Sequence, residues 1–468
     1  MMKGYRIELD SLGEVQVPES AYWGAQTQRA IENFPISGET FDSGFIRALG
    51  IIKKSAAKAN GKLGMIDQEI VGPIVRAADE VISGELDDQF PVDIFQTGSG
   101  TSSNMNINEV VANRACEIIG EKIGSKIIHP NDHVNFGQSS NDIIPTVMHI
   151  AALEAIENEV IPALNILREA LEKKEIEFED VVKTGRTHLQ DATPVTLGQE
   201  FGGYKAQISK GILRVKNVRK SLEELPIGGT AVGTGLNMHP DFPETAIEYI
   251  SEETGILFRE AENHFEAQAA HDAMSEAHAS LRVVAGSMNK IANDLRLLAS
   301  GPRNGLGELI QPENQPGSSI MPGKINPVIA EAVNQVHKRI MGNDVTIAYG
   351  ASEGQLELNL YKPILANDFL NSAKILSNVA VVFAEKFISL LGANKDKCEE
   401  QVEWSMALAT SLSPHIGYDK AAKIAKSAYE NKKKVRDVVI ESGEISEEEI
   451  DKILDARRMT KPGILGSE

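Results

Sequence analysis

Apolar residues recur at helical spacing over three long stretches of the chain. The first runs from Thr146 to about Phe178 and is interrupted only by Pro162, so we expect a long helix with a kink. At 1.5 Å per residue this helix would be about 45–50 Å long. The other two stretches run from Phe265 to Ala299 and from Pro363 to Leu391. Long amphipathic helices joined by short connections predict a helical bundle, and apolar stripes of this length are typical of helices that also pack against other subunits.

The regions before and after these stretches are less regular. The first 140 residues combine short apolar runs with many turns and show no strong strand alternation. We expect two helices there, from Phe45 to Leu63 and from Ile70 to Ser83, and a loop of small residues from Gln96 to Thr101 that leads into a third helix. After Lys395 the helices are predicted to be shorter, and one of them begins with the capping box Ser446 to Glu449. The pattern therefore predicts a mainly α protein.

Charge and cysteine content limit the classes of partner and the cellular compartment that we expect. The 468 residues carry a formal net charge of −20, which argues against a nucleic acid partner because phosphate backbones are bound by basic faces. An anionic substrate would have to be held by local positive groups. Only Cys116 and Cys398 are present, too few for a disulfide framework or a thiolate metal cage, which favours a reducing cytoplasm. The N-terminus has no apolar signal segment, and no apolar run reaches the length of a membrane span.

The stretch from Gly317 to Pro327 carries the strongest chemical signal. Pro-Gly pairs favour turns at two points, so Ser318 is expected on a loop outside regular structure. Asn326 is a favourable N-cap and the proline after it suits a first helical position, which predicts a helix that runs to about Met341. The free N–H groups at the start of that helix, together with Lys324 and Asn326, favour binding of a carboxylate or a phosphate.

Three further polar segments contain residue types that are common in active sites. The segment from Gly185 to Pro194 places a threonine next to His188, whose imidazole is suited to proton transfer near neutral pH. The segment from Gln138 to Asp142 is expected to cap the first long helix or to bind a carboxylate through its hydroxyl and amide groups. The segment from His129 to Asn135 contains potential metal ligands, but its proline and crowded short side chains indicate a polar turn.

The residues GSSIMPGKINP at positions 317–327 resemble the signature of the fumarase/aspartase superfamily, G-S-S-x-M-P-x-K-x-N-P, with every fixed position filled. Further matches at Trp23 to Gln28, Gln96 to Thr101 and His415 to Ala421 extend the resemblance over nearly the whole chain, which is most similar to the metal-free class II fumarases. The resemblance implies a mainly α subunit of three domains, residues 1–140, 141–394 and 395–468. It also implies a homotetramer with a shared helical core and active sites built from three subunits.

The resemblance assigns roles to individual residues. Ser318 would remove the proton from the carbon next to a carboxylate of malate, and His188, oriented by Glu331, would handle the water that leaves or enters. No metal ion and no cofactor are implied. The residues expected to hold the substrate carboxylates and the water are Ser99, Gly100, Thr101, Ser139, Ser140, Asn141, Thr187, Ser319, Lys324, Ile325 and Asn326. A second, non-catalytic dicarboxylate site would consist of His129, Pro130, Asn131 and Asp132.

Aspartase is the nearest alternative, because it uses the same fold and carbanion chemistry but eliminates ammonia instead of water. Three segments resemble fumarases more than aspartases: Ser139 to Asn141, Pro322 to Lys324 and Asp191 to Pro194. Three features depart from the usual bacterial fumarase pattern: His133 in place of aspartate, the pair Phe136-Gly137, and Lys126 where an arginine often completes the second site.

A different class of alternative is a catalytically silent relative that acts as a structural or binding protein. Such a protein is expected to have lost at least one of the four residues that carry the chemistry. All four are present: Ser318, His188, Lys324 and Glu331.

Overall fold

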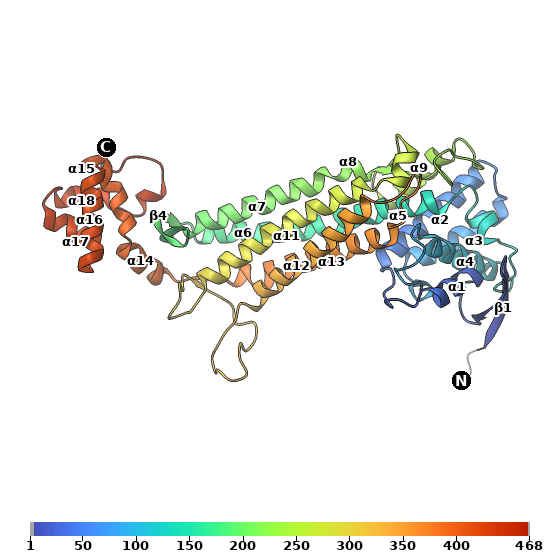
Figure 1. Cartoon of the computed structure of the whole chain (residues 1–468), viewed down its shortest axis with the longest axis horizontal. Coiled ribbons are helices and arrows are strands. Elements are labelled where there is room, and N and C mark those ends of the chain that lie inside the picture. The colour runs from blue at the N-terminus through green and yellow to red at the C-terminus, as the bar shows by residue number, and fades with distance from the viewer. Residues whose placement is uncertain (1–3, 467–468) are drawn as a thin grey trace. The chain divides into compact units, whose positions relative to one another are not determined.

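The computed structural model describes residues 4–466 and consists mainly of helices (Figure 1). Its residues group into two compact units. Unit 1 contains Met1–Pro162, Leu213–Ala285 and Lys338–Ser377, and unit 2 contains Ala163–Ile212, Gly286–His337 and Asn378–Glu468. Three long helices contribute residues to both units: α11 (Asp272–Leu298), α12 (Val328–Ala351) and α13 (Lys362–Lys386).

Unit 1 is organised around α2 (Ser43–Lys62), whose side chains Phe45, Ile51 and Ile52 are fully buried. The helices that pack against α2 are α3 (Gln68–Ile82), α4 (Thr101–Ile118), α5 (Ser140–Ala155) and α9 (Phe242–Thr254). Burial of this many apolar side chains is the main stabilising contribution, about 25 cal/mol for each Å² of apolar surface removed from water. The predicted helices over 45–63 and 70–83, and the helix that follows Thr101, are confirmed to within a few residues.

The first strands of unit 1 correct one expectation. An antiparallel hairpin is formed by β1 (Tyr5–Asp10) and β2 (Gly13–Pro18), in a region where we expected no strand alternation. The apolar residues of β1 do alternate, but they lie on the outer face, where Tyr5, Ile7 and Leu9 are more than half exposed, whereas Glu8 is buried; the apolar residues of β2, Val15 and Val17, are buried. The inverted pattern has a simple cause: Glu8 binds Arg6 and accepts a hydrogen bond from the Ala25 N–H.

The long predicted helices are present, with interruptions. Between α5 and α6 (Ile161–Glu177) the backbone forms one π turn, Ile156–Val160, directly before Pro162. This turn accommodates the proline, which lacks the N–H that the helical ladder needs, so the predicted interruption at Pro162 corresponds to a π turn. The second stretch is not one helix: α10 (His264–Ala269) ends where Ala270 adopts extended backbone angles, and α11 begins at Asp272. The third stretch, α13, ends at Lys386 instead of Leu391.

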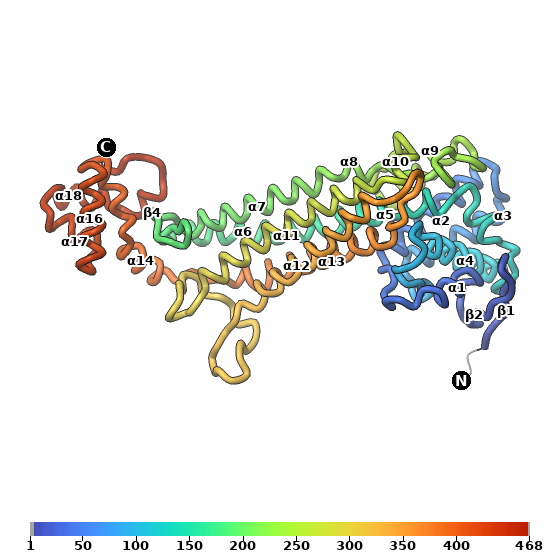
Figure 2. Tube along the Cα trace, viewed as in Figure 1, coloured from blue at the N-terminus to red at the C-terminus, as the bar shows by residue number. Residues whose placement is uncertain are grey.

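Unit 2 combines a helical pair with a cluster of short helices. Helix α6 and helix α7 (Leu197–Asn217) run side by side, joined by ion pairs from Lys205 to Glu172 and Glu175 (Figure 2). The C-terminal cluster contains α14 (Lys395–Trp404), α15 (Ser413–Ile416), α16 (Tyr418–Asn431), α17 (Val435–Ser442) and α18 (Glu447–Ile453). Helices α16, α17 and α18 contribute to one apolar core, and the predicted capping box at Ser446 and Glu449 is confirmed.

The remaining elements are short. They are α1 (Ala25–Asn33), α8 (Arg219–Leu222), the hairpin strands β3 (Val182–Thr187) and β4 (Gln190–Thr196), the two-residue strands β5 (Glu224–Leu225), β6 (Arg259–Glu260), β7 (Leu309–Ile310) and β8 (Gly392–Ala393), and several 3₁₀ turns. Every sheet among the described residues has two strands. No helix within residues 4–466 has both the length and the apolar character that a membrane span requires.

Candidate active site

The loop that carries Ser318 belongs to unit 2 and is closed by two hydrogen bonds. The Gly317 N–H donates to the Lys324 carbonyl at 2.8 Å, and the Asn326 side-chain amide donates to the Gly317 carbonyl at 2.7 Å. A Cβ atom at position 317 would lie 2.3 Å from the Lys324 oxygen, so this closure requires glycine. The predicted N-cap is therefore wrong: Asn326 closes the loop, and α12 begins two residues later at Val328. The helix extends to Ala351, ten residues beyond the predicted end.

The hydroxyl oxygen of Ser318 receives two backbone hydrogen bonds. The N–H of Met321 donates to it at 2.9 Å and the N–H of Ile320 at 3.2 Å. Ser318 itself is half-buried, whereas Ser319, Ile320 and Met321 are exposed. Hydrogen bonds donated to an oxygen favour its anionic form over its protonated form, so this geometry suits a serine that acts as a base.

His188 lies at the tip of a tight hairpin in unit 2. Strands β3 and β4 pair up to Thr187 and Gln190, which leaves His188 and Leu189 as a two-residue turn. Both turn residues have positive φ, 55° for His188 and 60° for Leu189, a conformation that Asn and Gly usually provide. Non-glycine residues in this region cost about 1–3 kcal/mol each, and such strain is concentrated at functional sites. Both side chains are exposed, and the exposed fraction of Leu189 is 72%.

The base of this hairpin contains a buried ion network. Glu308 is fully buried, and its carboxylate lies 2.8 Å from Arg186 and 3.2 Å from Lys183. Lys183 also binds Glu200 at 2.8 Å, and Arg186 donates to the side chain of Gln401 on α14 at 3.0 Å. Burial raises the pKa of Glu200, partly offset by its contact with Lys183. The network fixes the strand that leads into Thr187 and His188.

Ser139, Ser140 and Asn141 form the start of α5 in unit 1. A capping box joins Ser139 to Asp142, as the sequence predicts. Burial raises the pKa of Asp142 to about 6, although three backbone N–H groups donate to its carboxylate. Those donors are Ser139 at 2.9 Å, Thr230 at 2.9 Å and Gly228 at 3.0 Å. The bonds from Thr230 and Gly228 attach the start of α5 to another segment of the chain.

That other segment, residues 226–240, is part of the site region and was missed in the sequence. The Asn141 side-chain amide donates to the carbonyl of Ala231 at 2.7 Å, and the segment lines a pocket with Ser139. Its sequence, PIGGTAVGTGLNMHP, contains four glycines, and Thr230 and Asn237 also have positive φ. The signal that could have identified this segment in the sequence is its run of turn-forming residues.

Ser99, Gly100 and Thr101 form the start of α4, also in unit 1. The hydroxyls of Ser99 and Thr101 lie 2.7 Å apart, and Gly100 takes the left-handed conformation with φ of 76°. A Cβ atom at Gly100 would lie 2.8 Å from Ile144 on α5, so glycine permits the two helix starts to approach each other. Asn104 completes the link, because its side-chain amide donates to the Ser140 hydroxyl at 3.1 Å.

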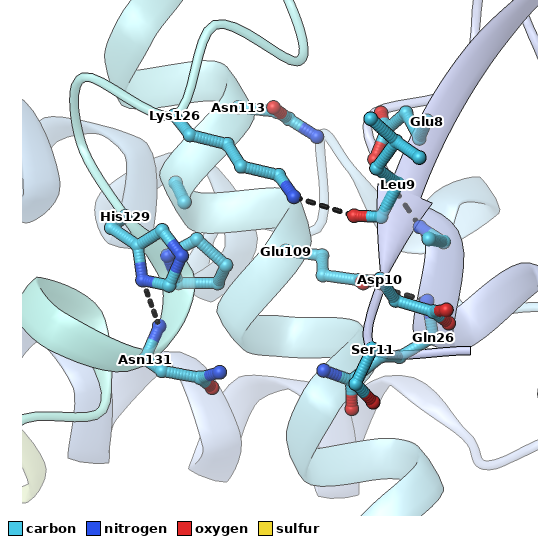
Figure 3. A pocket seen from close by; sticks show the side chains of 13 residues that line it. Glu8, Leu9, Asp10, Ser11, Gln26, Glu109, Asn113, Lys126, His129 and Asn131 are labelled. Carbon is cyan, nitrogen blue, oxygen red and sulfur yellow. Dashed lines mark hydrogen bonds between the residues drawn. The ribbon is translucent and has the colours of Figure 1, made fainter. Parts of the chain in front are cut away.

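The proposed second site coincides with part of a pocket of about 360 Å³ in unit 1 (Figure 3). Lys126, His129 and Asn131 lie on one side of it and Leu9 of β1 on the other, and Lys126 Nζ donates to the Leu9 carbonyl at 2.7 Å. The ring nitrogen Nδ1 of His129 accepts from the backbone N–H groups of Asn131 and Asp132, so the predicted polar turn is confirmed. Three carboxylates also line the pocket: Glu8, Asp10 and Glu109.

Each of these carboxylates has a partner within the fold. Glu8 binds Arg6, Asp10 binds Arg29 at 2.6 Å, and the buried Glu109 accepts hydrogen bonds from the start of α1. Arg29 lowers the pKa of Asp10, and burial raises the pKa of Glu109. The pocket is therefore a mixed-charge site whose charges are already paired.

The predicted site residues fall into two groups. In unit 1, hydrogen bonds through Asn104 bring Ser99–Thr101, Ser139–Asn141 and the turn after His129 together. In unit 2 lie Thr187, His188, Ser318, Ser319, Lys324, Ile325, Asn326 and Glu331. Within the described part of one chain, no hydrogen bond or ion pair joins His188 to Glu331 or to Ser318. Among residues 4–466, no group of three or more His, Cys, Asp or Glu side chains has the arrangement of a metal site.

Two family models match different parts of the chain. The sequence model of the Lyase family matches residues 13–342, and that of the fumarase C C-terminus matches residues 408–461. The chain is 67% identical over 468 residues to the class II fumarate hydratase of Halobacterium salinarum, covering 100% of both proteins. It is 51% identical to the mitochondrial fumarate hydratase of Saccharomyces cerevisiae, over 99% of this chain and 95% of the yeast protein.

The fold agrees with these sequence relationships. The crystal structure of the class II fumarase from Schistosoma mansoni superimposes with a TM-score of 0.95 at 41% identity, covering 98% of this chain and 100% of that one. High identity over the full length and a matching fold are independent measures of common descent. The chain belongs to the class II fumarate hydratase family.

Proposed function

We propose that this protein catalyses the reversible hydration of fumarate to (S)-malate. Fumarate hydration is the activity named for its full-length relatives, and Ser318, His188, Lys324 and Glu331 are all present. The observation that carries the proposal is the pair of backbone N–H groups directed at the Ser318 hydroxyl oxygen, 2.9 and 3.2 Å away. A serine is a poor base unless its alkoxide is stabilised, and this loop supplies the stabilisation.

In the malate-to-fumarate direction, Ser318 takes the proton from the carbon next to one carboxylate. The electron pair left behind spreads into that carboxylate and gives an aci-carboxylate with two negative charges. Donors placed where the charge grows are the largest source of rate acceleration in such reactions. Lys324 and Asn326, at the two ends of the turn before α12, are the donors that we assign to this task.

Departure of the hydroxyl group requires a proton, which we assign to His188. Imidazole exchanges protons readily near neutral pH, and the hairpin presents its ring to solvent at the tip of β3 and β4. Glu331 on α12 is the residue that we propose to orient His188. The remaining candidates would hold the substrate: Ser99, Gly100, Thr101, Ser139, Ser140, Asn141, Thr187, Ser319 and Ile325.

We further propose that the complete site is assembled from several copies of the chain in a homotetramer. The membership of the class II fumarate hydratase family supports this, because the resemblance implies active sites built from three subunits. Exposed apolar side chains on the long helices, such as Val345 and Tyr349 on α12 with 55% and 70% exposure, also support burial against other copies. The three-domain division at residues 140 and 394 remains part of this proposal.

The pocket at His129 to Asp132 is proposed as the second dicarboxylate site, with Lys126 as its cation. Occupancy would require Lys126 to leave the Leu9 carbonyl, since its ammonium is engaged there. We also propose a cytoplasmic location, which is supported by two cysteines that are both unpaired and buried.

The experiment that tests the function follows the ultraviolet absorbance of the fumarate double bond after addition of purified, chelator-treated protein. A fall in absorbance without ammonium, with malate as the product, is the expected result. If the loss requires ammonium and yields aspartate, the protein is an aspartase. If fumarate persists under both conditions, the catalytically silent alternative is correct.

A further inference from the structure

Lys53 is an unusual residue to find at the centre of unit 1. It lies on α2, its exposed fraction is 0%, and its ammonium group makes no ion pair within the described residues. Burial lowers its pKa to about 7. The charge of the buried Asp142 carboxylate opposes this effect without forming an ion pair with Lys53, and the remaining desolvation cost has to be compensated by the surrounding structure.

Three side-chain oxygens provide that compensation. Lys53 Nζ donates to Oδ1 of Asn104 at 2.9 Å, to Oε1 of Gln138 at 2.9 Å and to Oδ1 of Asn135 at 3.0 Å. An ammonium group has three N–H donors and no acceptor, so these three bonds use its full capacity. Replacing the ammonium with an apolar group would remove the donor of the Asn104 and Gln138 oxygens and leave the Asn135 oxygen with the Asn104 amide alone.

The three acceptors belong to three different candidate binding segments. Asn104 lies one turn into α4, directly after Ser99 to Thr101, and Asn135 ends the turn that contains His129 to Asp132. Gln138 immediately precedes Ser139. The Asn104 amide extends the connection, because it donates to Asn135 and to the Ser140 hydroxyl at 3.2 and 3.1 Å. A single buried nitrogen atom thus joins all segments of unit 1 to which we assign a dicarboxylate.

We propose that Lys53 is a positioning residue, which sets the relative placement of Ser99–Thr101 and Ser139–Asn141 and thereby the affinity of the site for dicarboxylates. It does not contact the substrate in this proposal. It acts through Asn104, whose amide donates to the Ser140 hydroxyl, and through Gln138, which directly precedes Ser139 in the chain and donates to the Val134 carbonyl. The inference rests on the proposed function of these segments as carboxylate-binding elements.

The test compares two neighbouring lysines of α2. Lys53→Met removes the ammonium but keeps a chain of similar length. Lys54→Met is the matched control, because Lys54 pairs with Asp79 at 2.7 Å and Glu253 at 2.6 Å and touches none of the binding segments. Both variants are expected to melt at a lower temperature. Only Lys53→Met is expected to raise KM for fumarate, about tenfold or more, with kcat changed by less than about threefold.

Direct binding separates this proposal from the proposed function. Calorimetric titration with succinate, a saturated dicarboxylate, should show the same loss of affinity in Lys53→Met as KM does, while Lys54→Met should match the unmodified protein. If the unmodified protein binds succinate but leaves fumarate unchanged, the proposed function is contradicted. The role of Lys53 can still be tested in that case, because the succinate Kd of Lys53→Met can be compared with that of the unmodified protein. An unmodified protein that binds no succinate would overturn both.

A milder substitution covers the case in which Lys53→Met does not fold. Gln138→Met removes one of the three acceptors at a half-buried position, and we expect it to raise KM about threefold. If KM and the succinate Kd stay within twofold of the unmodified protein in Gln138→Met, or in a folded Lys53→Met, Lys53 is only a structural residue and the proposal is wrong.

Discussion

Glu308 and Arg186 form a buried ion pair at 2.8 Å, directly below the turn that presents His188. The two residues are 122 positions apart in the sequence, so the pair ties the β3–β4 hairpin to the segment before β7. Lys183 lies on the same carboxylate at 3.2 Å. Glu308 therefore contacts two cations, of which Lys183 also pairs with Glu200, and the position of the hairpin depends on this network.

The first prediction concerns that carboxylate. Glu308→Gln should destabilise the protein by about 3–5 kcal/mol, because it leaves Arg186 without its counter-charge and Lys183 with Glu200 alone. Urea unfolding followed by circular dichroism measures the change. Glu430→Gln is the control, since Glu430 lies 3.8 Å from Lys426 in an exposed pair and is expected to change stability very little. A loss below about 1 kcal/mol in Glu308→Gln would mean that the network is solvated and weak.

The second prediction concerns the strained turn. Leu189→Gly should preserve or increase stability, because glycine adopts positive φ without the cost that leucine bears there, about 1–3 kcal/mol. Leu12→Gly is a suitable comparison: Leu12 is also an exposed leucine in a hairpin turn, with 79% exposure, but its φ is not positive. Thermal melting of both variants gives the answer. Equal losses of stability in the two variants would show that Leu189 is not strained.

The sequence identified the chemistry of the site better than its geometry. The loop at Ser318 and the helix starts at Ser99 to Thr101 and Ser139 to Asn141 occur where local turn and capping signals predicted them, whereas the hairpin that carries His188 was not predicted. Capping and turn formation depend on neighbouring residues, so a single sequence contains that information. The Asn326 cap failed because its amide binds the backbone of Gly317, nine residues away, and closes the loop instead.

Contacts between residues far apart in the sequence could not be predicted, because local patterns contain no information about them. The three acceptors of Lys53 lie 51, 82 and 85 residues along the chain, and no local pattern distinguishes this lysine from Lys54 beside it. In β1 the apolar residues Tyr5, Ile7 and Leu9 alternate in the sequence, but the sequence does not reveal that they point outward and that Glu8 is buried. Both the contacts of Lys53 and the buried face of β1 depend on the tertiary structure.

The third prediction tests the assigned base. Ser318→Ala should lower kcat by about 10²–10⁴-fold, the usual contribution of a positioned acid or base, and should leave assembly intact. Size-exclusion chromatography and the fumarate assay check the two parts of this statement. His188→Asn is expected to have a similar effect on turnover. Near-normal turnover in either variant would remove that residue from the mechanism.

The fourth prediction is a pH dependence of stability that arises from two buried lysines. Burial lowers the pKa of Lys53 and of Lys362 to about 7, and the exposed fraction of both is 0%. In the unfolded chain both return to the ordinary lysine pKa near 10.4. Between these values the unfolded chain binds more protons than the folded one, so the free energy of unfolding should increase as the pH rises above 7.

Each lysine contributes at most about 1.4 kcal/mol per pH unit to this slope. Urea unfolding at pH 7.5 and 8.5 measures this slope. Burial raises the pKa of the Cys398 thiol to about 12, whereas a thiol in the unfolded chain has a pKa of about 8.5, so Cys398 contributes with the opposite sign, by about 0.3 kcal/mol over this interval, which is less than the contribution of either lysine. Lys53→Met should remove about half of the increase, and Lys54→Met should leave it unchanged. A free energy of unfolding that stays constant or falls between these two pH values would show that both ammonium groups keep their protons in the folded protein, held by the oxygens of Asn104, Gln138, Asn135 and Asn141.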